Sequence, residues 1–149
     1  MIKQDKILPP TFLFICLLLT FVFHLFLPLM SIGSCYRPLG IVFITFGSVI
    51  NIWTDNLFKK NKTTVKPNKT PLKLITTGSF SFSRHPMYLG FILILVGTAV
   101  VLGSLSSFIA PVIMFITLQK KFIPFEEKNL ERIFRKEYVE YKDRVRQWL

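Results

Sequence analysis

The sequence predicts an all-α integral membrane protein with about four transmembrane helices, including a helical hairpin, and a C-terminal cytosolic amphipathic helix. Hydrophobic residues make up 51% of the 149 residues, and the mean hydropathy is +0.48. Several apolar stretches approach or reach the ~20 residues that cross the ~30 Å hydrocarbon core of a bilayer. Four spans and a polar tail leave no room for a separate soluble domain, so we predict a single membrane domain over residues 1–149.

The first two spans are predicted at residues 11–30 and 39–58. The first is apolar except for three residues, among them His24. We expect it to be retained as an anchor, because it is long for a signal peptide and no small-x-small cleavage pattern follows it. The second span becomes more polar from Asn51 onward, which indicates that it emerges there into the interface.

The third and fourth spans form the predicted hairpin. Residues 87–119 are almost uncharged, but as one helix they would be ~48 Å long, which is too long for the bilayer. Gly103 and the serines around it predict a turn, which gives spans at residues 87–103 and 105–119. Pro111 predicts a kink in the fourth span.

The distribution of basic residues predicts the orientation. Two Lys precede the first span, one Arg separates the first two spans, seven Lys and Arg lie between Lys59 and Arg84, and nine follow from Lys120 onward. The hairpin turn contains no Lys or Arg. The positive-inside bias therefore places both termini, the connection 59–86 and the tail 120–149 in the cytosol. The net charge of +11 then lies beside anionic lipid, which argues against a nucleic-acid partner.

The tail from about residue 125 onward predicts one amphipathic helix. Its apolar and aromatic residues recur at spacings of three and four: Leu130, Ile133, Phe134, Tyr138, Tyr141, Val145 and Trp148. We expect this helix to lie along the cytoplasmic interface or to fold back over the spans, with Trp148 and the tyrosines at headgroup level.

Ionisable residues gather at one membrane face, with Arg84 and His85 before the third span and Glu126 and Glu127 after the fourth. Such groups cost free energy at bilayer depth unless they are paired, solvated or bound to a ligand. Taken singly, each has a structural interpretation: Arg84 can set topology, Gly90 can permit close helix packing, and the two glutamates suit the first turn of a helix. The titratable ring of His85, beside Arg84, fits a functional role and a structural one equally well. The two cysteines lack metal-ligand spacing, and we predict no metal site and no disulfide.

Taken together, these residues resemble a known family. The segment 76–90 ends in Ser83-Arg84-His85-Pro86-Met87-Tyr88-Leu89-Gly90, and an apolar hairpin, Glu126-Glu127, Leu130 and Tyr138-x-x-Tyr141 follow it. Residues 62–149 thereby resemble the isoprenylcysteine carboxyl methyltransferase and phospholipid methyltransferase group, in its short bacterial branch. The resemblance implies a methyltransferase in a bacterial inner membrane that uses S-adenosylmethionine on a lipophilic substrate entering from the bilayer.

The resemblance also implies the positions of the site residues. Cofactor contacts fall on Leu72, Lys73, Leu74, Ile75, Phe80, His85, Pro86, Met87, Tyr88 and Glu126, and supporting positions are Arg84, Gly90, Glu127, Tyr138 and Tyr141. His85 and the backbone at the start of the third span are expected to donate to the carboxylate of the cofactor, and Glu126 to accept from its hydroxyl or ammonium groups. No catalytic side chain is assigned, because positioning supplies much of the barrier reduction in methyl transfer.

Two departures from the family pattern bear on the substrate. Phe122 stands where eukaryotic enzymes have an arginine four residues before the first glutamate, and Phe80 replaces a tyrosine. Lys120 or Lys121 could supply the missing cation. We therefore expect a lipophilic substrate that is either a prenylcysteine carboxylate or another membrane lipid, thiol or amine. A sterol-type reductase that uses NADPH and a non-enzymatic membrane scaffold are the alternatives, and the sequence does not determine the oligomeric state.

Overall fold

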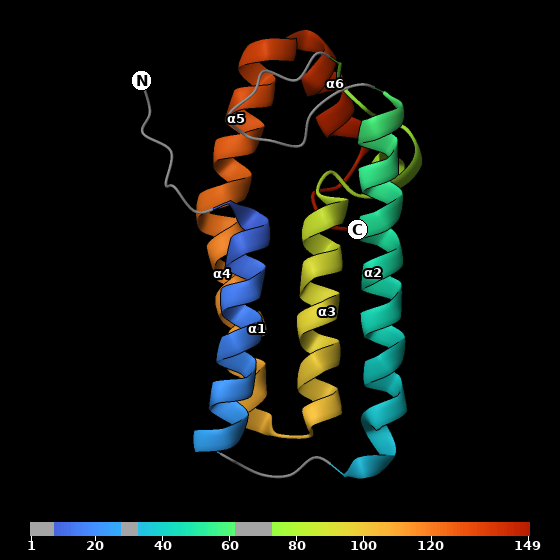
Figure 1. Cartoon of the computed structure of the whole chain (residues 1–149). Coiled ribbons are helices and arrows are strands. Elements are labelled where there is room, and N and C mark those ends of the chain that lie inside the picture. The colour runs from blue at the N-terminus through green and yellow to red at the C-terminus, as the bar shows by residue number, and fades with distance from the viewer. Residues whose placement is uncertain (1–7, 28–32, 62–72) are drawn as a thin grey trace. The chain divides into compact units, whose positions relative to one another are not determined.

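A computed structural model describes residues 8–27, 33–61 and 73–149 (Figure 1). Its α-helices are α1 (Pro9–Phe26), α2 (Arg37–Lys60), α3 (Pro86–Leu102), α4 (Ile109–Thr117), α5 (Ile123–Phe134) and α6 (Lys136–Arg144). Short 3-10 helices cover Ser34–Tyr36, Gly78–Ser81 and Leu105–Phe108, and a π-helical segment covers Leu118–Phe122. The all-α prediction is confirmed.

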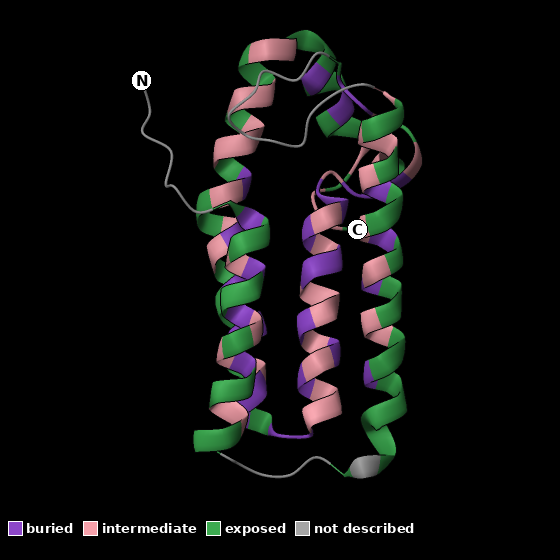
Figure 2. Cartoon of the chain, viewed as in Figure 1, coloured by how far each residue is buried: buried purple, intermediate pink, exposed green. Residues whose placement is uncertain are grey.

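Among the described residues, three helical stretches are long and apolar enough to cross a membrane: Pro9–Phe26, Arg37–Lys60 and Leu105–Phe134. The apolar helix α3 is shorter, at 17 residues. Large apolar side chains such as Phe14 lie exposed along α1, α2 and α4, as a lipid environment permits. Figure 2 shows the exposed positions along α1 and α2 in green. The predicted spans therefore fall on helices, although the last part of the first span lies outside the described residues.

Contacts within the chain divide it into two compact units, which are described separately below. The first comprises Met1–Thr45 and Ile92–Thr117, and the second comprises Phe46–Phe91 and Leu118–Leu149. The single domain over residues 1–149 stays a prediction.

In the first unit, α1 packs against α4 (Figure 1). The buried residues of α1 recur at spacings of three and four, which forms one stripe along the helix. Within this stripe the Sγ atom of Cys16 lies 4.0 Å from Sδ of Met114, and farther along α1 the carbonyl of Phe23 accepts a hydrogen bond from Ser106 Oγ at 3.1 Å. The stripe therefore faces α4 and the 3-10 helix before it.

The predicted turn between the third and fourth spans is confirmed. Helix α3 ends at Leu102, and Gly103 follows with φ of 71°, in the left-handed region that glycine occupies without steric cost. The predicted kink at Pro111 is wrong. Helix α4 begins only two residues earlier, at Ile109, so Pro111 lies in its first turn, where the missing N–H breaks no helical hydrogen bond.

The prediction of one helix along the tail is wrong. Helix α5 ends at Phe134, Arg135 adopts a positive φ of 46°, and α6 begins at Lys136. The N-terminal end of α5 also follows the fourth span without a break, through the π-helical segment. Because Pro124 lacks an N–H and crowds the carbonyl four residues earlier, the helix passes this point with π geometry.

The core of the second unit forms where α6 packs against α5. Tyr138 and Tyr141 are 1% and 3% exposed and pack with Leu74. Partly buried Phe80, Leu130, Phe134 and Val145 surround them. Their rings are thus buried inside the protein, and the expectation that they lie at headgroup level stays a prediction.

Candidate functional site

The C-terminal segment fixes the backbone at the start of α3. The N–H of Arg84 donates to the carbonyl of Arg146 at 3.1 Å, and Oγ of Ser83 donates to the carbonyl of Gln147 at 3.3 Å. The same Oγ accepts the N–H of His85 at 3.2 Å. The first two bonds join positions more than sixty residues apart, and the three together set the directions in which the Arg84 and His85 side chains project.

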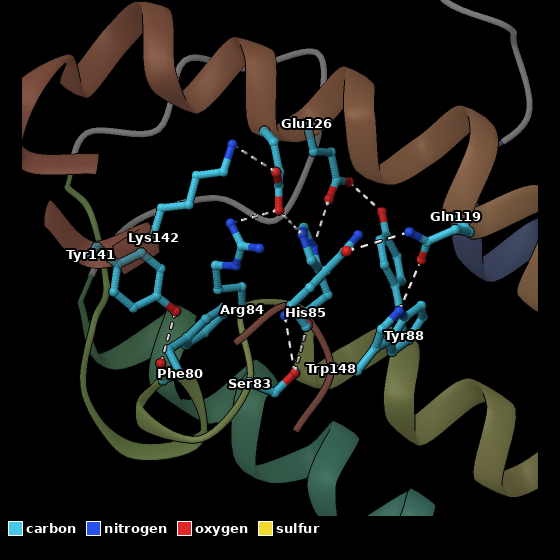
Figure 3. A network of polar contacts seen from close by, with 12 residues as sticks. Phe80, Ser83, Arg84, His85, Tyr88, Gln119, Glu126, Tyr141, Lys142 and Trp148 are labelled. Atoms are coloured by element: carbon cyan, nitrogen blue, oxygen red, sulfur yellow. Dashed lines mark hydrogen bonds and ion pairs between the residues drawn. The ribbon is translucent and has the colours of Figure 1, made fainter. Parts of the chain in front are cut away.

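Glu127 on α5 is the centre of an ion cluster, and its three partners Arg84, His85 and Lys142 are labelled in Figure 3. Its Oε1 lies 3.0 Å from Nη1 of Arg84 and 3.3 Å from Nε2 of His85, and its Oε2 lies 3.5 Å from Nζ of Lys142. The Arg84 and Glu127 side chains are only 10% and 13% exposed. At this depth Glu127 is stable as a carboxylate because cations surround it.

Glu126, one residue earlier, pairs with groups on and before α3. It accepts a hydrogen bond from the Tyr88 hydroxyl, and its Oε2 lies 3.6 Å from Nδ1 of His85. The Glu126 side chain is 27% exposed, so part of this carboxylate is open to a ligand.

Both ring nitrogens of His85 therefore face glutamates. Burial alone would lower the pKa of His85, but the hydrogen bonds and charges of Glu126 and Glu127 outweigh it and raise the pKa. The ring also stacks on Tyr88, with the two planes inclined by 7° and the centroids 5.5 Å apart. His85 is thus held on three sides in the orientation that joins the two carboxylates.

Phe80 is positioned by two contacts. Its carbonyl accepts the Tyr141 hydroxyl at 2.8 Å, and its ring meets that of Phe58 edge to face at 5.4 Å. The neighbouring Tyr138 has a hydroxyl beside the Arg84 guanidinium that makes no well-directed hydrogen bond within the described residues. Burial raises the pKa of Tyr138, so its hydroxyl stays protonated and is available as a donor.

The structure brings most of the predicted site residues into the second unit. Leu74 and Ile75 are buried in a segment without helix, Lys73 beside them is exposed, and Leu72 lies outside the described residues. Pro86 is the fully buried first residue of α3, and Met87 is half-buried.

Gly90 permits close packing of α3 against α2. A Cβ atom there would lie 2.5 Å from Oδ1 of Asn51, so α2 and α3 approach closely at this point. In the substrate region, Phe122 is half-buried, while Lys120 and Lys121 are exposed.

Several residues of the network were missed by sequence reasoning. Lys142 pairs with Glu127, and the side chains of Gln119, Gln147 and Trp148 bond one another. Nothing in the local sequence distinguishes Lys142 from the other basic residues of the tail, so its pairing with Glu127 could not be predicted. Gln119 carried a weak signal, since it is the polar residue that ends the apolar stretch 87–119.

Comparison with known proteins gives three kinds of match. The family model of phospholipid methyltransferases matches residues 36–137. A probable protein-S-isoprenylcysteine O-methyltransferase of Oryza sativa subsp. indica is 33% identical over 127 residues, 84% of this chain and 59% of the relative. Protein-S-isoprenylcysteine O-methyltransferase B of Arabidopsis thaliana is 41% identical over 73 residues, 49% of this chain and 37% of the relative. The chain thus spans less than two thirds of either relative.

The fold has also been seen in a solved structure. A eukaryotic intramembrane Ras methyltransferase, isoprenylcysteine carboxyl methyltransferase, superposes with a TM-score of 0.68 at 17% sequence identity, over 99% of this chain and 54% of the other. At this identity the likeness establishes the fold, that of an all-α integral membrane protein.

Proposed function

The chain belongs to the phospholipid methyltransferase family, and on this basis we propose that it transfers the methyl group of S-adenosylmethionine to a lipophilic substrate at the cytosolic face of the membrane. One observation carries the proposal. The motif residues Arg84, His85 and Tyr88 meet Glu126 and Glu127, about forty residues away in the sequence, in a single polar network. The names of the relatives, which are isoprenylcysteine O-methyltransferases, support the same reaction class.

The residues present suit this cofactor. It carries a sulfonium, an amino-acid head group and a ribose diol. Glu126, with its partly exposed carboxylate, can accept from a hydroxyl or ammonium group. Phe80 and Tyr88 offer aromatic faces for the adenine ring or for the cation. We assign His85 to the orientation of Glu126, because both of its ring nitrogens face glutamates.

When bound, this cofactor would supply an activated methyl group for in-line displacement, in which the carbon–sulfur bond would break as the new bond to the methyl carbon forms and a neutral thioether would leave. The protein contributes alignment and the exclusion of water. Buried groups such as Tyr138 and the fixed backbone of Ser83 and Arg84 suit this task, since they are held by contacts from three parts of the chain.

The substrate is proposed to be lipophilic and to come from the bilayer, as a prenylcysteine or another membrane lipid, thiol or amine. Phe122 at the end of the π-helical segment is apolar and half-buried, which favours a group less anionic than a free carboxylate at this position. The basic connection and tail support the cytosolic placement of this site.

Titration calorimetry of the detergent-purified full chain tests the proposal. We expect S-adenosylhomocysteine to bind and Glu126→Gln to weaken it about tenfold or more, since a hydrogen bond to a charged group contributes about 1.5–3 kcal/mol. Glu140→Gln, on the exposed side of α6, is the matched control and should leave affinity unchanged. A reductase would bind NADPH instead, and a scaffold neither ligand, so absence of S-adenosylhomocysteine binding would refute the proposal.

A further inference from the structure

Two adjacent buried side chains carry hydrogen-bond donors that the protein does not use. Nε of Arg84 is buried and unbonded within the described part of the chain, and Nη1 meets Glu127 as an ion pair without well-directed hydrogen-bond geometry. The hydroxyl of Tyr138, on a residue that is 1% exposed, is likewise unsatisfied. Buried donors without acceptors destabilise a folded protein, so such a pair is retained where something else supplies the acceptor.

Neighbouring protein groups are already committed. The carboxylate of Glu127 receives Arg84, His85 and Lys142, and that of Glu126 receives Tyr88 and His85. Arginine has no acceptor atoms, so even where the Tyr138 oxygen accepts from the Arg84 guanidinium beside it, the Tyr138 hydroxyl proton has no acceptor among the described residues. The missing partner must therefore be an acceptor, and a guanidinium edge favours an anionic one with two oxygens.

We propose that Arg84 and Tyr138 bind the carboxylate of the amino-acid head group of the methyl donor. This inference rests on the proposed function, and it moves the carboxylate from His85, whose two ring nitrogens face glutamates, to a pair of unused donors. The adjoining glutamates complement the ammonium of the same head group. The buried pair thus recognises an amino-acid zwitterion, and the aromatic residues recognise the nucleoside.

Two ligands that differ only in the head group separate this role from a general one. S-adenosylhomocysteine has the amino-acid head, whereas 5′-methylthioadenosine keeps the nucleoside and the thioether but lacks it. The measured quantity is the ratio of their dissociation constants, obtained by calorimetry on the detergent-purified full chain. A variant that loosens the whole site weakens the binding of both ligands, whereas loss of a head-group contact weakens only the binding of S-adenosylhomocysteine.

Tyr138→Phe is the main variant, because it removes an unsatisfied hydroxyl and keeps the buried ring, so the fold is preserved. We expect S-adenosylhomocysteine to bind about five- to tenfold more weakly and 5′-methylthioadenosine to be unchanged. Arg84→Lys keeps the charge, loses the guanidinium edge and should act in the same direction. Tyr141→Phe is the matched control: its hydroxyl already donates to Phe80, so any effect should reach both ligands equally.

The outcomes are distinct. An unchanged ratio in Tyr138→Phe would overturn the inference and show that only a buried water or no ligand meets these donors, while the proposed function stands. A wild-type chain that binds neither nucleoside would overturn the proposed function itself. Loss of both ligands in parallel in Tyr138→Phe would also overturn the inference, since the hydroxyl would then act on the site as a whole.

Discussion

Trp148, the penultimate residue, donates its indole N–H to Oε1 of Gln119 at 2.9 Å, although the two lie 29 positions apart. Gln119 in turn donates to Oε1 of Gln147 at 3.3 Å, and the carbonyl of Gln147 receives Ser83. The C-terminal segment therefore links the π-helical end of the fourth span to the backbone before α3. Both elements carry site residues, so this segment contributes to their alignment.

Replacing Trp148 by Phe removes the indole N–H and keeps an aromatic ring. We expect the free energy of unfolding to fall by about 1 kcal/mol, because a half-buried acceptor on Gln119 loses its donor. Thermal unfolding in detergent measures the effect. Deletion of Leu149, which is 69% exposed, is the control and should be neutral. Equal stability of Trp148→Phe and wild type would show that this bond does not hold the segment.

The protonation of His85 should make stability depend on pH. Burial lowers its pKa, but Glu126 and Glu127 outweigh burial and raise it above 6.5. The stabilisation is therefore fully present below pH 6.5 and is lost as pH rises through the raised pKa. Above pH 6.5, the melting temperature of wild type should fall more steeply than that of His85→Gln. Parallel pH profiles for the two proteins would contradict a protonated His85 in the folded state.

Gly78→Ala should destabilise the second unit. Gly78 has φ of 66°, and an added Cβ would lie 2.6 Å from Cδ1 of Leu57 on α2. We expect a loss of about 1–3 kcal/mol from the backbone strain and the steric overlap together, measured by thermal unfolding. Gly33→Ala is the control, because the nearest atom to its Cβ is at an ordinary 3.6 Å and its φ is not in the positive range. A similar change in both variants would argue against a specific requirement at position 78.

Arg135→Gly should stabilise the protein. Arg135 adopts φ of 46° and ψ of −117° between α5 and α6, a conformation that costs a residue with a Cβ about 1–2 kcal/mol. Glycine avoids most of this cost, so the melting temperature should rise. Lys128→Gly, on the exposed side of α5, should instead lower it by about 1 kcal/mol of helix stability. A destabilised Arg135→Gly variant would mean that the Arg135 side chain contributes more than its backbone strain costs.

Phe122→Arg tests the substrate class under the proposed function. Wild type should methylate a farnesylcysteine analogue poorly, because an unpaired carboxylate entering a partly buried site costs several kcal/mol. The arginine should raise that activity severalfold, as measured with a radiolabelled methyl donor, provided that thermal unfolding shows an intact fold. Efficient turnover by wild type would indicate that another cation, such as Lys121, already pairs with the carboxylate.

Much of the architecture was determined by local sequence. Apolar length identifies the membrane helices, since a helix satisfies its backbone hydrogen bonds within one segment in lipid. Gly103, near the middle of the uncharged stretch 87–119, identifies the turn, because it supplies the positive φ that the turn requires. The polar residues of the site could also be named in advance, since uncompensated ionisable groups beside a membrane are rare without a reason.

Other features were decided only by tertiary structure. The break at Arg135 has no glycine or proline to announce it, and it forms where Tyr138 and Tyr141 turn inward against Leu74. An amphipathic spacing does not distinguish burial in protein from burial in an interface, so the packing of the tyrosines inside the second unit could not be predicted. The partners of Glu127 could not be read from the sequence either. Ion pairs between Arg84, Glu127 and a tail lysine depend on long-range chain packing, which leaves no periodic signal.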